Sequence, residues 1–307
     1  MIICLSLNPS LDKTLSVSKF TLDAPNRVRI ERADVSGKAV NVACAVHALG
    51  EEVTLIGFDY ENAPIADTMT KAGIGYELRT LRGKLRTNLK LRDLSAGRTI
   101  EINEAGCEAG QADIAAVRES LLRYAAPGNY AALSGSLPPG VPKSIYRDLC
   151  AELKKGGCFV AVDCDGEALK LALEARPDLI KPNEQEFAAL TGADMTDEAA
   201  VFAALDQIHA RGIGIVCLSL GPKGALLSVN GKRLYCPAAD VTPLSVAGAG
   251  DNMLAALLTA LNRHMDYGAA LRFASAASGA AIMRPGTQPC QMDDVTRLMG
   301  DLRVIEK

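Results

Sequence analysis

Short apolar runs alternate with segments of helical spacing along most of the chain. The runs predict buried strands near residues 2–7, 53–57, 131–134, 159–163, 179–181, 214–219 and 225–229. Apolar positions at helical spacing predict helices near residues 40–49, 65–72, 113–124, 143–155, 184–191 and 198–211. Because near-continuous apolar strands alternate with helices, the pattern predicts an α/β fold. Its central, mainly parallel sheet is expected to be flanked by helices on both faces.

Two stretches depart from this rhythm, at residues about 13–35 and about 85–104. Polar and apolar side chains alternate there around turn signals at residues 23–26 and 95–97, which indicates half-exposed hairpins. We expect the hairpins to pair into a small antiparallel sheet that projects from the core, as a lid over a site or as a subunit contact. The chain shows no internal repeat and no low-complexity linker, so residues 1–307 are expected to form one domain with this inserted β lid.

Composition narrows the possible functions. The 307 residues are 49% hydrophobic, which is enough for a sizeable core and excludes wholesale disorder. A net charge of −3 argues against a broad nucleic-acid surface. No apolar run reaches the roughly 20 residues of a membrane span, and the first residues look like a buried strand rather than a signal peptide. The nine cysteines lack CxxC spacing, which favours buried thiols in a reducing cytoplasm.

The strongest local signal is Ala247-Gly248-Ala249-Gly250-Asp251, directly before an apolar helical run. Free N–H groups and the helix dipole converge at such a turn and can bind an anion. Asp251 is then either a helix cap or a general base beside a phosphate-binding turn. The segment is not a Walker loop, because no Lys-Ser/Thr pair follows the glycines.

A second motif, Lys181-Pro182-Asn183-Glu184-Gln185-Glu186, joins a strand end to a helix start. Asn183 and Glu186 are three positions apart and can face one opening. Their oxygens suit Mg²⁺ held through its waters, or they form a capping box. The turn at residues 8–12 places Asp12 beyond the first strand, where a ligand binds in an open parallel sheet. Asp12 could bond sugar hydroxyls there, or the segment is a simple turn.

Basic residues follow the alternating stretches. Arg86, Asn88 and Lys90 share one face of a strand, and Arg27 lies in the earlier stretch. Such a face suits a sugar phosphate, although a solvated strand face gives the same pattern. Glycine and lysine at residues 37–38 open a helix and are a weak anion-binding signal. Loops at residues 134–140 and 219–224 could border a nucleotide.

These motifs, in this order, resemble the PfkB (ribokinase-like) carbohydrate kinases, and among them the branch of 1-phosphofructokinases and tagatose-6-phosphate kinases. The matching segments are NPSLD, PNRV, SGKAVNVA, RTNLK, SGSLPPGVP, KPNEQE and AGAGDNM, which extend over essentially the whole chain. The resemblance implies a ribokinase-like, Rossmann-like fold with a β lid that often forms a homodimer contact. It also implies ATP-dependent, Mg²⁺-dependent phosphorylation of a ketohexose phosphate.

Residue by residue, the resemblance assigns Asp251 the position of the catalytic base and Gly248, Ala249 and Gly250 that of the anion hole. Sugar contacts fall on Asp12, Gly37 and Asn41. Positions near the acceptor's own phosphate fall on Arg27, Lys38, Arg86 and Lys90, with Asn88 beside them. Nucleotide and Mg²⁺ contacts fall on Asn183, Glu186, Ser219, Gly221 and Gly224.

The expected acceptor is fructose 1-phosphate, with tagatose 6-phosphate or another phosphosugar as the alternative and a catalytically silent sugar-phosphate sensor as a further one. Three positions depart from the family pattern. Ser36 and Ala39 replace glycines, and Val246 replaces a usual hydroxyl residue before the anion turn. These changes bear on substrate choice more than on the reaction class.

Overall fold

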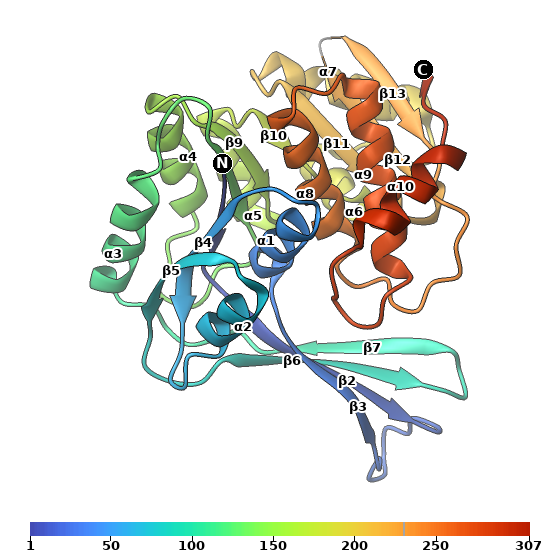
Figure 1. Ribbon diagram of the computed structural model, residues 1–307. Helices are drawn as coiled ribbons and strands as arrows, with labels where there is room; N and C mark the ends of the chain where they lie inside the picture. Colours follow the sequence, from blue (N-terminus) through green and yellow to red (C-terminus); the bar gives the residue numbers. More distant parts are fainter. Residues whose placement is uncertain (230) are drawn as a thin grey trace.

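The computed structural model describes residues 1–229 and 231–307 (Figure 1). Within them, ten strands form the central sheet in the order β14-β13-β12-β11-β10-β9-β8-β1-β4-β5. Their bounds are β1 Ile2–Ser6, β4 Val53–Asp59, β5 Gly75–Thr80, β8 Tyr130–Ser134, β9 Phe159–Asp163, β10 Leu179–Ile180, β11 Ile215–Ser219, β12 Ala225–Val229, β13 Lys232–Cys236 and β14 Ile305–Glu306. The strands from β5 to β11 pair in parallel, and β12, β13 and β14 add an antiparallel edge.

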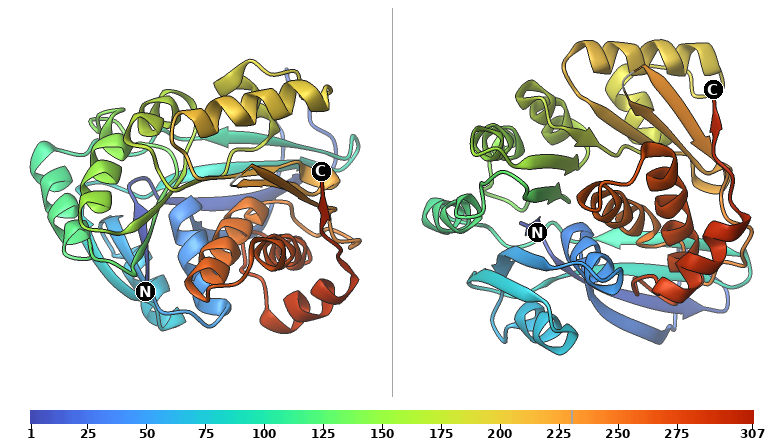
Figure 2. Two further views of the ribbon diagram at one scale, coloured as in Figure 1. Left: turned by 90° about the horizontal axis from the view of Figure 1, so that it is seen from above. Right: turned by 45° about the horizontal axis from the view of Figure 1, so that its top comes forward.

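Helices cover both faces of this sheet (Figure 2). One face packs against α1 Lys38–Ala48, α2 Pro64–Ala72, α8 Ala249–Asn262, α9 Tyr267–Ile282 and α10 Met292–Asp301. The other packs against α3 Gln111–Leu122, α4 Ile145–Lys155, α5 Gly166–Ala172, α6 Glu184–Thr191 and α7 Glu198–Ala210. In β1, Ile2 and Cys4 join the first core cluster while Ile3 and Leu5 join the second. Burial on both faces explains why the strand reads as an uninterrupted apolar run.

Four strands form the lid below the core in Figure 1, in the order β3-β2-β6-β7. Their bounds are β2 Ser10–Val17, β3 Arg29–Ser36, β6 Arg86–Asp93 and β7 Arg98–Asn103. Each hairpin is antiparallel, but β2 and β6 pair in parallel, so the expectation of a wholly antiparallel lid is wrong. The reason lies in the core: β2 follows β1 and β6 follows β5, and these parallel strands end at the same sheet edge. Both lid strands therefore leave the core in one direction.

The α/β architecture expected from the sequence, a mainly parallel sheet flanked by helices, is confirmed, and the expected strands and helices are present with small shifts of their ends. Several further elements were not expected, namely β5, β13, β14, α5, α9 and α10. β5 forms an edge of the sheet and shows no apolar run, so periodicity gave no signal there. None of the described helices has the length and apolarity needed to cross a membrane.

Candidate active site

A cavity of about 580 Å³ lies between the carboxyl ends of the parallel strands and the lid. This is the edge at which open α/β sheets bind ligands. Among its lining residues are the expected Asp12, Gly37, Lys38, Asn41, Arg86, Asn88, Lys90, Asn183, Glu186, Ser219, Gly248, Gly250 and Asp251. The tertiary structure thus brings together segments that lie more than 200 residues apart in the sequence.

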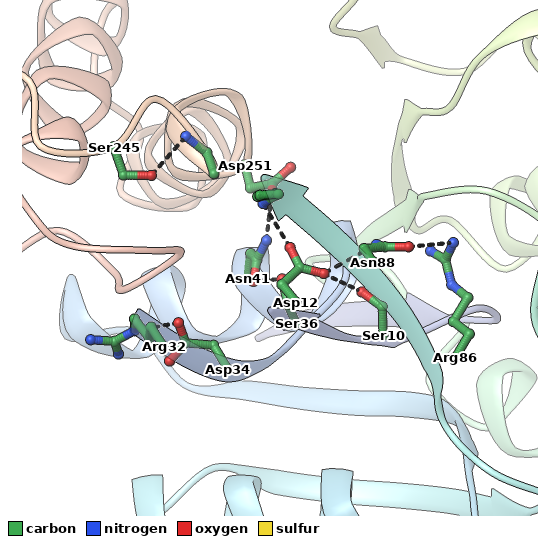
Figure 3. Close-up of polar contacts among 12 residues, drawn as sticks. Ser10, Asp12, Arg32, Asp34, Ser36, Asn41, Arg86, Asn88, Ser245 and Asp251 are labelled. Atoms are coloured by element: carbon green, nitrogen blue, oxygen red, sulfur yellow. Dashed lines mark hydrogen bonds and ion pairs between the residues drawn. The ribbon is translucent and has the colours of Figure 1, made fainter. Parts of the chain in front are cut away.

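Asp251 is the third residue of α8 and is buried. It does not cap the helix: Gly248 is the N-cap, and the Asp251 carboxylate instead accepts a hydrogen bond from Asn41 Nδ2 at 2.7 Å (Figure 3). Burial and the nearby Asp163 charge raise the pKa of Asp251, against the opposing effects of Lys38 and Asn41. A carboxylate with a raised pKa that faces a cavity can accept a proton from a bound hydroxyl.

The turn before Asp251 can hold a phosphate. Gly248 adopts φ 80°, a left-handed conformation that favours glycine, and no side chain caps the helix there. The first N–H groups of α8 therefore lack intrahelical partners and are available to an anion. Lys181 Nζ comes so close that a Cβ on Gly250 would lie 3.1 Å from it. The glycine thus leaves room between the turn and an ammonium group.

Asp163 and Lys181 were not among the predicted site residues, and they form the centre of the charged network. Asp163 ends β9 and is buried, 2.8 Å from Lys38 Nζ and 3.2 Å from Lys181 Nζ. Burial favours the neutral acid, but Lys181 and Lys38 outweigh it, so the pKa of Asp163 lies below its ordinary value. One signal was present in the sequence, because an apolar strand that ends on a carboxylate places that group at the binding edge of the sheet.

Lys38 lies elsewhere than expected. The resemblance placed it near the acceptor's phosphate, but its ammonium group contacts Asp163 and lies 3.6 Å from Glu186 Oε1, close to Asp251. These carboxylates raise the pKa of Lys38 despite its burial, so the side chain stays charged. Lys38 therefore belongs to the end of the cavity that holds Asp163, Glu186 and Asp251.

Asn183 and Glu186 form a capping box at the start of α6. Asn183 Oδ1 accepts from the Glu186 N–H at 2.8 Å, and Glu186 Oε2 accepts from the Asn183 N–H at 2.9 Å. The capping box does not exclude metal binding. It uses only Oε2 of Glu186, and Oε1 faces Lys38 instead. Within the described residues no cluster of three His, Cys, Asp or Glu side chains could enclose a metal ion. This donor set fits Mg²⁺ held largely by water and phosphate oxygens.

Asp12 lies on strand β2 of the lid rather than in a turn, and three neighbours orient it. Ser10 Oγ and Asn88 Nδ2 donate to Asp12 Oδ1 at 2.8 and 3.1 Å, and Lys90 Nζ contacts Oδ2 at 2.8 Å (Figure 3 labels Ser10, Asp12 and Asn88). A fixed carboxylate of this kind can accept hydrogen bonds from sugar hydroxyls. The charge of Lys90 is already balanced by Asp12.

Arg86 has a different environment. Its guanidinium donates to the carbonyl oxygens of Asn8, Pro9 and Glu104 and to the Ser136 hydroxyl, at 3.0–3.4 Å. Among the described residues no carboxylate forms an ion pair with it, and burial lowers its pKa. Arg86 and Lys90 are four residues apart on one strand, which separates their Cα atoms by about 13 Å at the usual rise. Arg86 also donates to Asn88 Oδ1 at 3.4 Å, so it has hydrogen-bond acceptors around it but no carboxylate among the described residues to balance its charge.

Gly37 and Asn41 link the lid to the core. Gly37 has φ 125°, and a Cβ there would lie 3.0 Å from Pro9 Cα, so this glycine is required by the close approach of two chain segments. Ser36, which departs from the family's glycine, donates its hydroxyl to Asn41 Oδ1 at 3.2 Å. Ser36 thereby helps to orient the amide that contacts Asp251.

Four predicted residues do not line the cavity, and one of them is Ala249, the first residue of α8. Arg27 is exposed in the loop of the β2–β3 hairpin, so a substrate contact finds no support within one chain. Gly221 and Gly224 lie in the turn beyond Ser219. A Cβ on Gly224 would lie 2.1 Å from Cys236 O, which gives this glycine a structural reason. Sequence motifs locate these residues near the site but do not separate ligand contacts from turn geometry.

Comparison with known proteins places this architecture in a family. Residues 7–294 match the family described as pfkB family carbohydrate kinase. The chain is 39% identical to a 1-phosphofructokinase of Rhodobacter capsulatus, over 90% of this chain and 89% of that one. It is 34% identical to a 1-phosphofructokinase of Xanthomonas campestris pv. campestris, over 84% and 83%. The solved structure of Escherichia coli phosphofructokinase-2 in complex with substrates and products superimposes with a TM-score of 0.91 at 27% identity, over 98% of both chains. The chain therefore belongs to the pfkB family of carbohydrate kinases.

Proposed function

We propose that this kinase transfers the γ-phosphoryl group of ATP to a hydroxyl of a phosphorylated ketohexose, converting fructose 1-phosphate to fructose 1,6-bisphosphate. The observation that carries the choice of a phosphorylated acceptor is Arg86. This half-buried cation lines the same cavity as Asp251 and pairs with no carboxylate of residues 1–229 and 231–307. A neutral sugar would leave that charge uncompensated. The relatives named 1-phosphofructokinase support the same acceptor.

Asp251 acts as the general base in this proposal. It accepts the proton of the acceptor hydroxyl as that oxygen forms a bond to the γ-phosphorus, and the bond from this phosphorus to the β-bridging oxygen breaks to release ADP. Asn41 holds the carboxylate in place by its 2.7 Å hydrogen bond. The raised pKa makes Asp251 a stronger base than an exposed aspartate.

The core end of the cavity stabilises the charge on the transferring group. The first turn of α8 offers backbone N–H groups from Ala249 and Gly250, and Lys38 and Lys181 add two ammonium groups. Glu186 and Asn183 would hold Mg²⁺ through water. When bound, the ion supplies positive charge to the phosphate oxygens. Ser219, beside Asn183 in the fold, borders the nucleotide in this arrangement.

The lid end selects the acceptor. Asp12 and Asn88 bond sugar hydroxyls, and Arg86 with Ser136 binds the phosphate that the acceptor already carries. Lid residues thus hold the sugar so that its far hydroxyl reaches Asp251. Closure of the lid over the cavity would also exclude water from the reaction.

The direct test is ADP release with ATP and Mg²⁺ against fructose 1-phosphate, tagatose 6-phosphate, fructose 6-phosphate and fructose. We expect the highest kcat/KM with fructose 1-phosphate. A higher value with tagatose 6-phosphate would replace the acceptor and keep the mechanism. A preference for unphosphorylated fructose would reject the role of Arg86, and binding without turnover on all four would favour a sugar-phosphate sensor.

We also propose that the lid mediates a homodimer. Val28, Ile30 and Ile102 are large apolar side chains on its strands and turns, and they are 44%, 65% and 56% exposed. Such exposure on a small one-sided sheet favours association with a second copy.

The nine thiols form no disulfide in the described residues, which supports a reducing location such as the cytoplasm.

A further inference from the structure

Asn252 follows Asp251 in α8 and is fully buried, with 0% of its surface exposed. Both ends of its side-chain amide have partners. Nδ2 donates to Gly248 O at 2.8 Å, and Oδ1 accepts from the Cys290 N–H at 2.9 Å. Asn252 does not line the cavity. Its amide therefore joins the phosphate-binding turn to a segment 38 residues further along the chain.

The Gly248 contact acts on the anion turn itself. Gly248 O accepts two hydrogen bonds, from the Asn252 backbone N–H at 2.9 Å and from Nδ2. Because a trans peptide is planar, a fixed carbonyl also fixes the opposite N–H of the same peptide, which belongs to Ala249. That N–H makes only a long contact of 3.5 Å to Val246 O. Asn252 thus sets the direction of a donor that the anion turn offers.

The Cys290 contact acts on the loop between α9 and α10. In this loop Thr287 lines the cavity, and a Cβ on Gly248 would lie 3.7 Å from Thr287 Cα. The neighbouring Gly286 packs so closely on the Arg32–Asp34 ion pair of the lid that a Cβ there would lie 2.5 Å from Asp34 Oδ2. The loop therefore contacts the anion turn on one side and the lid on the other, and the Asn252 amide holds it against α8.

We propose that Asn252 is a positioning residue for phosphoryl transfer. It touches no substrate and acts by fixing the Gly248–Ala249 peptide and the 283–291 loop relative to each other. Loss of its amide leaves the Gly248 carbonyl held by the Asn252 backbone N–H alone, so the Ala249 N–H points less accurately at the developing charge, while the lid contacts to the sugar stay intact. This inference rests on the proposed transfer at Asp251.

The test measures kcat and the KM for the phosphosugar in Asn252→Ala, Asn252→Ser and Asn252→Cys. Serine and cysteine have similar volumes, but only the hydroxyl is a good donor to the carbonyl four residues back. We expect Asn252→Ala to lower kcat at least about tenfold with KM changed less than about twofold, because misdirected donors lose transition-state contacts. We expect the serine variant to exceed the cysteine variant about fivefold in kcat.

A matched control is Thr259→Val, which changes another fully buried polar side chain of α8 that lies further along the helix. It should keep the wild-type kcat. If Asn252→Ala folds with wild-type kcat, or if serine and cysteine variants have equal kcat, the inference is wrong. If Asn252→Ala fails to fold, the serine–cysteine pair decides. Asp251→Asn in the same assay distinguishes failure of the proposed base from failure of the positioning role. If Asp251→Asn stays active, the proposed base is wrong. If Asp251→Asn is inactive while Asn252→Ala keeps the wild-type kcat, only the positioning role is rejected.

Discussion

The α/β core and the β lid contribute to one cavity by different physical means. Core strands such as β1 are buried on both faces, whereas β7 has five of its six residues exposed. At the core end, the carboxylates of Asp163, Glu186 and Asp251 face the ammonium groups of Lys38 and Lys181. At the lid end, Asp12 and Lys90 balance each other, and Arg86 forms no ion pair in the part of the chain that the structure describes.

This difference in charge indicates that the two ends of the cavity have different functions. The carboxylates at the core end suit a divalent cation, and Arg86 at the lid end, which pairs with no carboxylate among the described residues, suits an acceptor phosphate. The core side chains are also held by packed strands and helix ends, so they can be placed accurately for chemistry. Changes at the core end should therefore alter kcat or folding, and changes at the lid end should alter KM.

The largest effect is expected for Asp251→Asn. It removes the base, so kcat should fall about 10³- to 10⁴-fold with phosphosugar binding retained. Burial raises the pKa of Asp251 above the ordinary aspartate value of 3.8. At pH values above 3.8 the buried carboxylate therefore destabilises the folded state, and the neutral amide should raise the melting temperature. The wild-type kcat/KM should fall with falling pH as this carboxylate is protonated.

Asp165→Asn, in the same cavity, is the control for Asp251→Asn and should keep kcat within about threefold. A comparable loss there would contradict the assignment.

Asp163→Asn should chiefly destabilise the core. It leaves two ammonium groups without their shared carboxylate, which costs about 3 kcal/mol of unfolding free energy. The pKa of Asp163 is lowered in the fold, so its contribution is present above the unfolded pKa and lost as the pH falls through the folded one. Urea unfolding should show a large gap between wild type and variant near neutral pH and a smaller gap in acid. An equal gap at both pH values would exclude the ion pairs as its cause.

Arg86→Gln should change recognition at the lid. Loss of the free cation is expected to raise the KM for the phosphosugar about 30-fold, with kcat at saturation changed much less. Arg98→Gln provides the comparison on the neighbouring strand, because Arg98 already pairs with Asp93 at 3.4 Å. It should leave both constants unchanged. A fall in kcat without a change in KM in Arg86→Gln would place this residue in the chemistry instead.

The smallest effect on the single chain is expected for Ile102→Glu on the exposed face of β7. Unfolding free energy should change by less than about 0.5 kcal/mol, since the side chain is 56% exposed. If the lid mediates self-association, sedimentation should show a shift toward monomer relative to Ile305→Glu, a change at an exposed isoleucine of β14 in the central sheet. Equal sedimentation of both variants and the wild type would exclude the lid face as the contact.

Some residues of the candidate site could be predicted from the sequence and others could not. The anion turn at Gly248 and its neighbour Asp251 could be located because glycines before an apolar helix have one structural meaning, a helix N-terminus. Asp163 could not, since a carboxylate at a strand end is common and its partners come from residues 38 and 181. Arg27 matched a family segment yet lies outside the cavity, because a motif gives the position along the chain and not the direction of a hairpin loop.

The sequence by itself determined the α/β alternation, the two hairpins and the helix start at the anion turn. These follow from local periodicity and from glycine conformations, which neighbouring residues decide. Only the tertiary structure decided that β2 and β6 run in parallel, that Lys38 joins Asp163, and that Asn252 reaches Cys290. Each of these contacts joins segments 38 to 125 residues apart. They depend on which sheet edge two strands leave and which helix ends meet there, and no local pattern contains that information.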